Sequence, residues 1–188
     1  MARKETISSQ MILDTAFQMA REEGLKNITA RRVAERANCS TQPIFRSFQS
    51  MEDLTGGVYE KAVSFFQDYY SMYPRFGKFP FADLGMAYIA FAREEKELFR
   101  MLFVSEDPKK SLYEILNGGS ENVKKEIQAA AAQGCPDPGE MFMKMWIFIH
   151  GAACMSLTGD YDLSDQETGQ MLKNVYQSFL GVSGNERR

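Results

Sequence analysis

The chain has 188 residues, enough for one sizeable domain or for a small domain followed by a larger one. Hydrophobic residues make up 44% and charged residues 25%, so a disordered or collagen-like chain is excluded. With a formal net charge of −3, any contact with nucleic acid needs a local basic region. Residues 1–61 carry nine Lys and Arg against eight Asp and Glu, and the remainder carries thirteen against seventeen. This asymmetry indicates two regions with different roles.

Apolar residues follow helical spacing from the start of the chain. The stripe from Ile12 to Ala20 predicts a first helix, which we expect to end at Gly24 with a left-handed cap. A short second helix is predicted from a Thr29 N-cap through residue 37. After a break, Ser40 is expected to cap a third helix that begins at residue 41.

A long fourth helix is predicted over residues 50–73. Ser50 to Asp53 form an acidic capping box at its start, and Pro74 marks its end. The sequence predicts a turn over 74–81 and further helices around 82–93, 95–104, 108–132, 138–158 and 164–181. No stretch shows the alternation that is typical of a strand. The expected fold class is therefore all-α.

Residues 28–47 have the pattern of a helix-turn-helix motif. Two helices of about two turns each flank a tight turn, and polar residues open the second helix. In this motif the second helix enters the major groove of DNA while the first crosses the phosphate backbone. A plain helical corner would give a similar pattern, so the spacing of further residues has to decide.

Those further residues resemble the N-terminal domain of the TetR family of bacterial transcriptional regulators. The similar positions lie between Ile12 and Leu54 and include Ala16-Phe17, Gly24, Ile28-Thr29, Val33-Ala34, Ala37, Ser40, Ile44 to Phe48, Ser50 and Glu52 to Leu54. The resemblance implies a three-helix DNA-binding domain over residues 1–50, connected by the fourth helix to a larger helical domain over 51–188. That larger domain is expected to bind an effector and to form a homodimer.

The resemblance also implies which residues contact DNA. The candidates are Arg3, Lys4, Thr29, Arg31, Ser40, Thr41, Gln42, Pro43, Phe45, Arg46 and Ser47. Three positions depart from the family pattern. Asn38 replaces the usual turn glycine but tolerates positive φ. Phe45 replaces an aromatic that offers a phenol to a phosphate, and Met51 replaces a lysine, so both remove phosphate contacts.

Aromatic residues are concentrated between residues 65 and 103, where twelve of the chain's twenty-three lie. Most are expected in a core, but sites for small molecules between helices are also lined by aromatic side chains. The residues that we expect to line an effector site are Phe65, Phe66, Tyr69, Tyr73, Tyr88, Phe91, Phe103, Tyr113, Trp146 and His150. The absence of a Lys/Arg cluster among them favours an apolar effector over a phosphorylated one.

The last two predicted helices are too apolar to face solvent alone. An internal core would explain this, and so would a four-helix interface between two copies, which the resemblance favours. The predicted interface residues are Phe148, Met155, Leu172, Val175, Tyr176 and Phe179. The apolar stretch around residues 141–157 is interrupted by Lys144 and His150, so we expect no membrane span and a cytoplasmic protein.

Enzymatic chemistry is weakly supported by the sequence. His150 precedes Cys154 by one helical turn, but a buried histidine is the simpler interpretation. With one histidine and three scattered cysteines, we expect no metal site, no catalytic residue and no cofactor. The prediction is a repressor that binds a palindromic operator in double-stranded DNA and is released by a small apolar effector. The alternative is a helical enzyme or small-molecule carrier with a vestigial DNA-binding domain.

Overall fold

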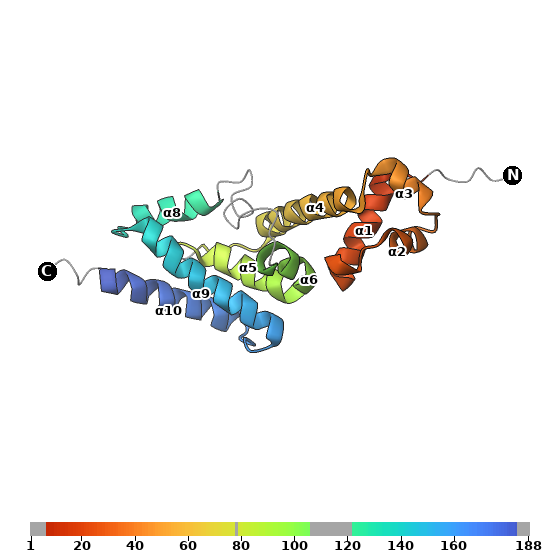
Figure 1. Ribbon diagram of the computed structural model, residues 1–188. Coiled ribbons are helices and arrows are strands. Elements are labelled where there is room, and N and C mark those ends of the chain that lie inside the picture. Colours follow the sequence, from red (N-terminus) through yellow and green to blue (C-terminus); the bar gives the residue numbers. More distant parts are fainter. Residues whose placement is uncertain (1–6, 78, 106–121, 184–188) are drawn as a thin grey trace. The chain divides into compact units, whose positions relative to one another are not determined.

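The computed structural model describes residues 7–77, 79–105 and 122–183, with side chains up to residue 180. Every regular element within these ranges is a helix, which confirms the all-α prediction. The elements in chain order (Figure 1) are α1 (Ser9–Glu23), the 3-10 turn η1 (Leu25–Asn27), α2 (Ala30–Arg36), α3 (Gln42–Ser47), α4 (Met51–Met72), α5 (Ala82–Glu94), α6 (Lys96–Phe99), the π-helical η2 (Arg100–Val104), α8 (Asn122–Ala132), α9 (Pro138–Thr158) and α10 (Asp165–Ser183). The first part of the helix predicted over 108–132 lies outside the described residues.

Short polar side chains set the starts of the N-terminal helices. The Ser8 hydroxyl oxygen accepts the Met11 N–H at 3.1 Å, and the Thr29 hydroxyl oxygen accepts the Arg32 N–H at 3.3 Å. At the start of α4, Ser50 Oγ accepts the Asp53 N–H at 3.2 Å. These contacts satisfy backbone donors that have no partner within the helix. The Thr29 and Ser50 caps were expected from the sequence.

Two details of the predicted helix ends are wrong. The helix α3 begins at Gln42, because the first helical hydrogen bonds are accepted by the Thr41 carbonyl; Thr41, not Ser40, is therefore the N-cap. Gly24 has φ 85° but ψ 157°, which is an extended rather than a left-handed conformation. A Cβ there would lie 2.9 Å from a carboxylate oxygen at the flexible end of Glu97, so the positive φ is the stronger reason for glycine.

The turn between α2 and α3 has the conformation that the sequence predicts. Asn38 adopts φ 51°, in the left-handed region that asparagine tolerates better than most residues. The Cys39 N–H then donates to the Ala34 carbonyl at 2.9 Å, which closes the turn. Asn38 therefore adopts a conformation that glycine more often supplies.

The chain forms two compact units that divide α4 between them. The first unit contains residues 1–65 and 95–109, of which 7–65 and 95–105 are described. Its core is built from α1, α2, α3 and the first part of α4 and comprises Ile12, Ala16, Met19, Ala20, Ile28, Val33, Ala34, Ile44, Leu54 and Val58. These side chains are almost fully excluded from water, and this burial is the main stabilising contribution.

A buried ion pair ties α1 to the start of α6 within the first unit. Arg21 forms a bidentate pair with Glu95, with 2.7 Å between its Nε and one carboxylate oxygen. The Glu95 side chain is only 8% exposed, whereas that of Arg21 is 38% exposed. The guanidinium also lies 5.0 Å from the centre of the Phe65 ring, at cation–π distance.

The second unit contains residues 66–94 and 110–188, and its described centre is the packing of α5 against α9 and α10. Gly85 on α5 allows the closest approach, because a Cβ there would lie 2.8 Å from Leu172 and 3.2 Å from Ile149. Nearly every residue of α5 is buried, so this helix is apolar on all sides. The sequence predicts a helix around residues 82–93 but not that nearly all of it is buried.

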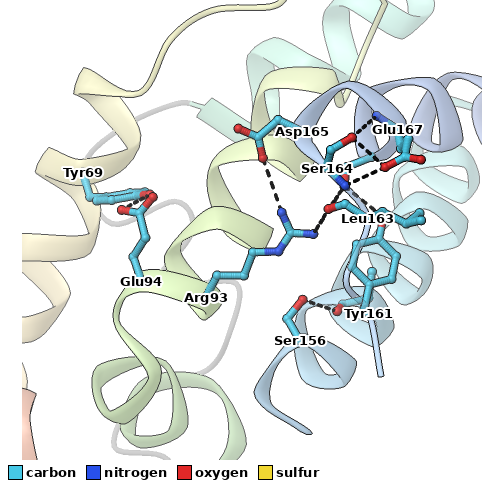
Figure 2. A network of polar contacts seen from close by, with 11 residues as sticks. Tyr69, Arg93, Glu94, Ser156, Tyr161, Leu163, Ser164, Asp165 and Glu167 are labelled. Carbon is cyan, nitrogen blue, oxygen red and sulfur yellow. Dashed lines mark hydrogen bonds and ion pairs between the residues drawn. The ribbon is translucent and has the colours of Figure 1, made fainter. Parts of the chain in front are cut away.

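Polar contacts fasten the C-terminal end of α5 to the connection between α9 and α10 (Figure 2). Arg93 donates to the Leu163 carbonyl at 2.7 Å and pairs with Asp165 at 3.3 Å, and its guanidinium lies 5.4 Å from the Tyr161 ring centre. The neighbouring Glu94 accepts the Tyr69 hydroxyl at 2.9 Å. Arg93 and Glu94, which are adjacent on α5, thus contact two different parts of the second unit: the α9–α10 connection and the last turns of α4.

The helix α9 is long and apolar enough to cross a bilayer by composition alone, with a mean hydropathy of 1.2 in its best window. It is the one such helix within the described ranges. A core helix passes the same test, and α9 packs against α5, α8 and α10. Its composition therefore does not indicate a membrane protein.

Candidate functional site

The helix α3 presents a polar face to solvent. Ile44 is buried against the core of the first unit, and this anchor turns Thr41, Gln42, Phe45 and Arg46 outward, all of them exposed. The outward residues are spaced by three or four positions, so they share one helical face. This face combines hydrogen-bonding groups, an aromatic ring and a cation, as a surface that reads base edges requires.

Of the four arginines on α2 and α3, two form ion pairs within the described residues and two do not. Arg32 pairs with Glu23, and Arg36 pairs with Glu22 and Glu23, so both cations are held by the end of α1. Arg31 and Arg46 are exposed and form no ion pair with any side chain in the described part of the chain. Of these four arginines, Arg31 and Arg46 are therefore ready to receive a phosphate without first breaking an internal contact.

The remaining predicted DNA contacts differ in exposure. Thr29 and Ser40 are exposed, whereas Pro43 and Ser47 are half-buried. Thr29 uses its hydroxyl oxygen as the α2 cap, but the hydroxyl hydrogen can still be donated. Arg3 and Lys4 lie outside the described residues.

We expect Arg31→Ala to weaken DNA binding for all sequences and to reduce the slope of log K against log salt concentration by about one per subunit. The reason is the loss of one phosphate neutralised by an unpaired cation. The measurement is a salt titration of binding to a labelled duplex. Arg36→Ala is the matched control, because its guanidinium is already neutralised by two glutamates. An equal reduction of the slope in both variants would contradict the assignment.

The second unit contains a continuous series of ring contacts. Tyr88 stands at its centre, fully buried, with centroid distances of 6.1 Å to Phe66 and 4.8 Å to Trp146. The series extends in order through Phe76, Tyr73, Tyr69, Phe91, Phe66, Tyr88, Trp146, Phe142, Phe81, Tyr176 and Phe79. It brings together Phe66, Tyr69, Tyr73, Tyr88, Phe91 and Trp146 of the predicted effector site.

Other members of that predicted site belong to the first unit or are not described. Phe65 contacts Phe17 and Phe103 contacts Phe99, all within the first unit. Tyr113 lies outside the described residues. The hydroxyls of Tyr69 and Tyr88, which could otherwise bond a ligand, already have protein partners.

His150 joins the ring series through a polar contact. Its Nδ1 lies 2.9 Å from the Tyr88 hydroxyl, its Nε2 lies 3.5 Å from Cys154 Sγ, and its ring stacks on Trp146. Burial lowers the pKa of His150 and raises that of Cys154, so it favours the neutral form of each. A nucleophilic pair would need a stabilised thiolate, which this environment opposes.

A buried hydroxyl without a partner was not predicted from the sequence. Tyr176 is 4% exposed, and its hydroxyl makes no hydrogen bond with the described residues. The sequence places Tyr176 on an apolar stripe, but periodicity cannot tell an inner stripe from an interface. No signal in the sequence identifies this hydroxyl.

A half-buried carboxylate contacts the backbone beside Tyr176 in the ring series. Glu126 on α8 accepts the Phe81 N–H at 2.6 Å, where Phe81 has the unusual φ of 68°. Desolvation raises the pKa of Glu126 above its ordinary value. The neighbouring Asp83 is paired with Arg75 at 3.8 Å.

The part of the chain that the structure describes contains no group of three or more metal-ligating side chains.

His150 and Glu126 predict opposite effects of pH on stability. The pKa of His150 is lowered on folding, so below about pH 6.5 the unfolded chain gains a proton that the folded chain resists, and stability falls. The pKa of Glu126 is raised, so its protonation as the pH falls favours the folded state. We expect His150→Gln to flatten the loss of stability as the pH falls below about 6.5, and Glu126→Gln to remove the opposing gain as the pH falls toward about 4.5. Urea unfolding at several pH values measures both, and a steeper loss in His150→Gln would contradict the assignment.

The predicted dimer surface is divided between core and exterior. Leu172 and Tyr176 are buried within the second unit, whereas Met155 is 47% exposed and Phe148, Val175 and Phe179 are half-buried. Further exposed apolar residues that the sequence did not predict are Met143, Ile147 and Met171. Four exposed residues of α9 recur every four positions and therefore form one outward row, which consists of Met143, Ile147, Gly151 and Met155.

Comparisons with known proteins agree with this architecture. Residues 12–56 match the family described as "Bacterial regulatory proteins, tetR family", and residues 81–179, more than half of the chain, match "Tetracyclin repressor-like, C-terminal domain". A search of curated protein sequences finds no significant match.

Solved structures share the fold at low sequence identity. A TetR-like transcriptional regulator from Rhodococcus sp. RHA1 has a TM-score of 0.64 and 12% identity over 97% of this chain and 100% of that one. A TetR-family regulator from Haemophilus influenzae RD gives 0.63 and 14%, over 90% and 94%. The multidrug binding protein EbrR, complexed with ethidium, gives 0.53 and 16%, over 89% and 97%.

Proposed function

This chain belongs to the TetR family of bacterial transcriptional regulators, and from that premise we propose that it is a cytoplasmic repressor, released from its operator by a small apolar molecule. Membership of this family establishes DNA-binding transcriptional regulation rather than catalysis. We assign DNA binding to residues 1–50 and effector binding and dimerisation to residues 51–188, with the fourth helix as the connection. The alternative of an enzyme or carrier with a vestigial DNA-binding domain has no observation in its favour.

The exposed face of α3 is the observation that carries the proposal of operator binding. Thr41 and Gln42 supply hydrogen-bonding groups on this face. Arg46 beside them and Arg31 on the preceding helix supply cations that form no ion pair with the described residues. Together these are the groups that binding to base edges and phosphates requires. The test is binding-site selection from random duplexes, followed by Gln42→Ala. We propose that this variant relaxes the preference at one operator position, at a cost of roughly 1–3 kcal/mol there. An unchanged preference would show that Gln42 does not read bases.

The exposed apolar row on α9 supports a homodimer on a palindromic operator. Ile147 is 66% exposed and Met143 54% exposed, which is costly for side chains that never leave water. Gly151 lies one turn further along the α9 row, and a Cβ there would meet open space within 4 Å, so a second helix could approach closely. Two copies related by a two-fold axis would present two α3 helices to two half-sites.

The ring series of the second unit supports an apolar effector. Its members contact one another, so a ligand would have to displace side chains, and the neighbouring methionines are flexible enough to adjust. The unpaired Tyr176 hydroxyl offers the polar anchor that Tyr69 and Tyr88 cannot spare. Arg75, which could attract a phosphate, is already paired with Asp83. The fold of this chain is also that of EbrR, which was solved with ethidium.

A thermal-shift screen of aromatic, long-chain and phosphorylated compounds that do not bind DNA tests the effector proposal. Compounds that raise the melting temperature are then tested for release of the protein from its selected operator. We expect apolar compounds to do both, and Tyr176→Phe to weaken their effect while leaving operator binding unchanged. Stabilisation by the phosphorylated set alone would refute an apolar effector. An apolar compound that tightens DNA binding would refute the repressor assignment.

A further inference from the structure

Phe45 is an aromatic side chain that the fold leaves in water. It is 55% exposed on the outward face of α3, while Phe17, another ring of the first unit, is 3% exposed. No ring or cation–π contact involves Phe45 within the described residues. Its exposure therefore contributes nothing to the core, and a substitution there should leave folding intact.

The position of Phe45 places it beside the polar residues of the same face. Thr41 precedes it by four residues and Gln42 by three, and Arg46 follows directly, all exposed. A phenylalanine ring offers no hydrogen bond to a phosphate, and Arg46 already supplies a cation for that purpose. The ring is thus an apolar element within a surface that is otherwise suited to the polar groups of DNA.

The major groove of DNA presents one apolar group on its base edges, the C5-methyl group of thymine. We propose that Phe45 determines part of the sequence preference by packing against a thymine methyl group in each half-site. The proposal rests on operator binding through α3, which is the proposed function, and adds the chemistry of one contact. The alternative is that the Phe45 ring packs against a deoxyribose of the backbone. That contact would be the same for every DNA sequence.

The test replaces single thymines by deoxyuridine in the operator selected by the full-length protein. Each replacement removes one methyl group and leaves the hydrogen-bonding pattern of the base unchanged. For wild-type protein we expect one thymine per half-site whose replacement weakens binding about fourfold, which is the loss expected for one buried carbon. For Phe45→Ala we expect weaker binding that no longer distinguishes thymine from deoxyuridine at that position.

Val104→Ala is the matched control, because Val104 is a 47% exposed apolar residue of the same unit outside the helix-turn-helix. It should keep the full sensitivity to deoxyuridine. If Phe45→Ala binds too weakly to measure, Phe45→Val should bind with reduced sensitivity. Absence of any sensitive thymine, or equal sensitivity with and without the ring, would overturn the proposal while leaving operator binding intact. No selected operator at all would instead refute the proposed function.

Discussion

Ile147→Asp is expected to convert the protein to a monomer and to weaken operator binding by at least about 100-fold. The charge would stand in the middle of the exposed row on α9, where a second copy would have to desolvate it. Separating the two copies also removes the effective concentration that joins the two half-sites, which commonly contributes a factor of roughly 10² to 10⁴. Light scattering at micromolar concentration and titration of the operator measure the two effects.

Met72→Asp is the control for this prediction. Met72 is 84% exposed on α4 and lies outside the proposed α9 interface, so the new charge would not have to be desolvated there. It should leave both mass and operator affinity unchanged. A dimeric Ile147→Asp protein, or a wild-type protein that is monomeric at micromolar concentration, would exclude the α9 row as the interface.

Arg21→Ala is expected to destabilise the first unit by about 2–3 kcal/mol, less than the full cost of breaking a wholly buried pair because Arg21 is partly solvated. The variant leaves the Glu95 carboxylate buried without its cation, and it also removes the contact with the Phe65 ring. Glu95→Gln should cost less, because water can reach the guanidinium that it leaves behind. Urea denaturation followed by circular dichroism compares the two variants.

Arg36 provides a close match for this comparison. Its side chain is 39% exposed, almost the same as that of Arg21, but its partners Glu22 and Glu23 are 49% and 33% exposed. We expect Arg36→Ala to cost under about 1 kcal/mol, as exposed ion pairs do. Equal costs for Arg21→Ala and Arg36→Ala would mean that burial of the carboxylate partner does not set the strength of the pair.

The helices were predictable wherever local chemistry decides them. The Thr29 cap and the positive φ of Asn38 depend on residues close in sequence, and both were expected correctly. The exposed residues of α3 follow from Ile44, whose burial fixes the orientation of a short helix. The predicted polar face of the DNA-binding region could therefore be read from the spacing alone.

The partners of side chains distant in sequence could not be predicted. The sequence does not show that Glu95 pairs with Arg21, or that Tyr88 and Tyr69 find partners in the same unit. Periodicity assigns Leu172 to an apolar stripe without telling whether that stripe faces α5 or a second chain. Only the packing around Gly85 decides that Leu172 points inward.

The single tryptophan makes one half of the molecule separately observable. Trp146 is 7% exposed and lies among rings of the second unit, so its fluorescence reports unfolding of that unit alone. Circular dichroism instead sums the helices of both units. If the two signals change at the same urea concentration, the divided helix α4 joins the units into one cooperative transition. If the circular dichroism begins to fall at a lower urea concentration than the fluorescence changes, the first unit unfolds while the second stays folded. The free energy of unfolding can then be measured for each unit separately.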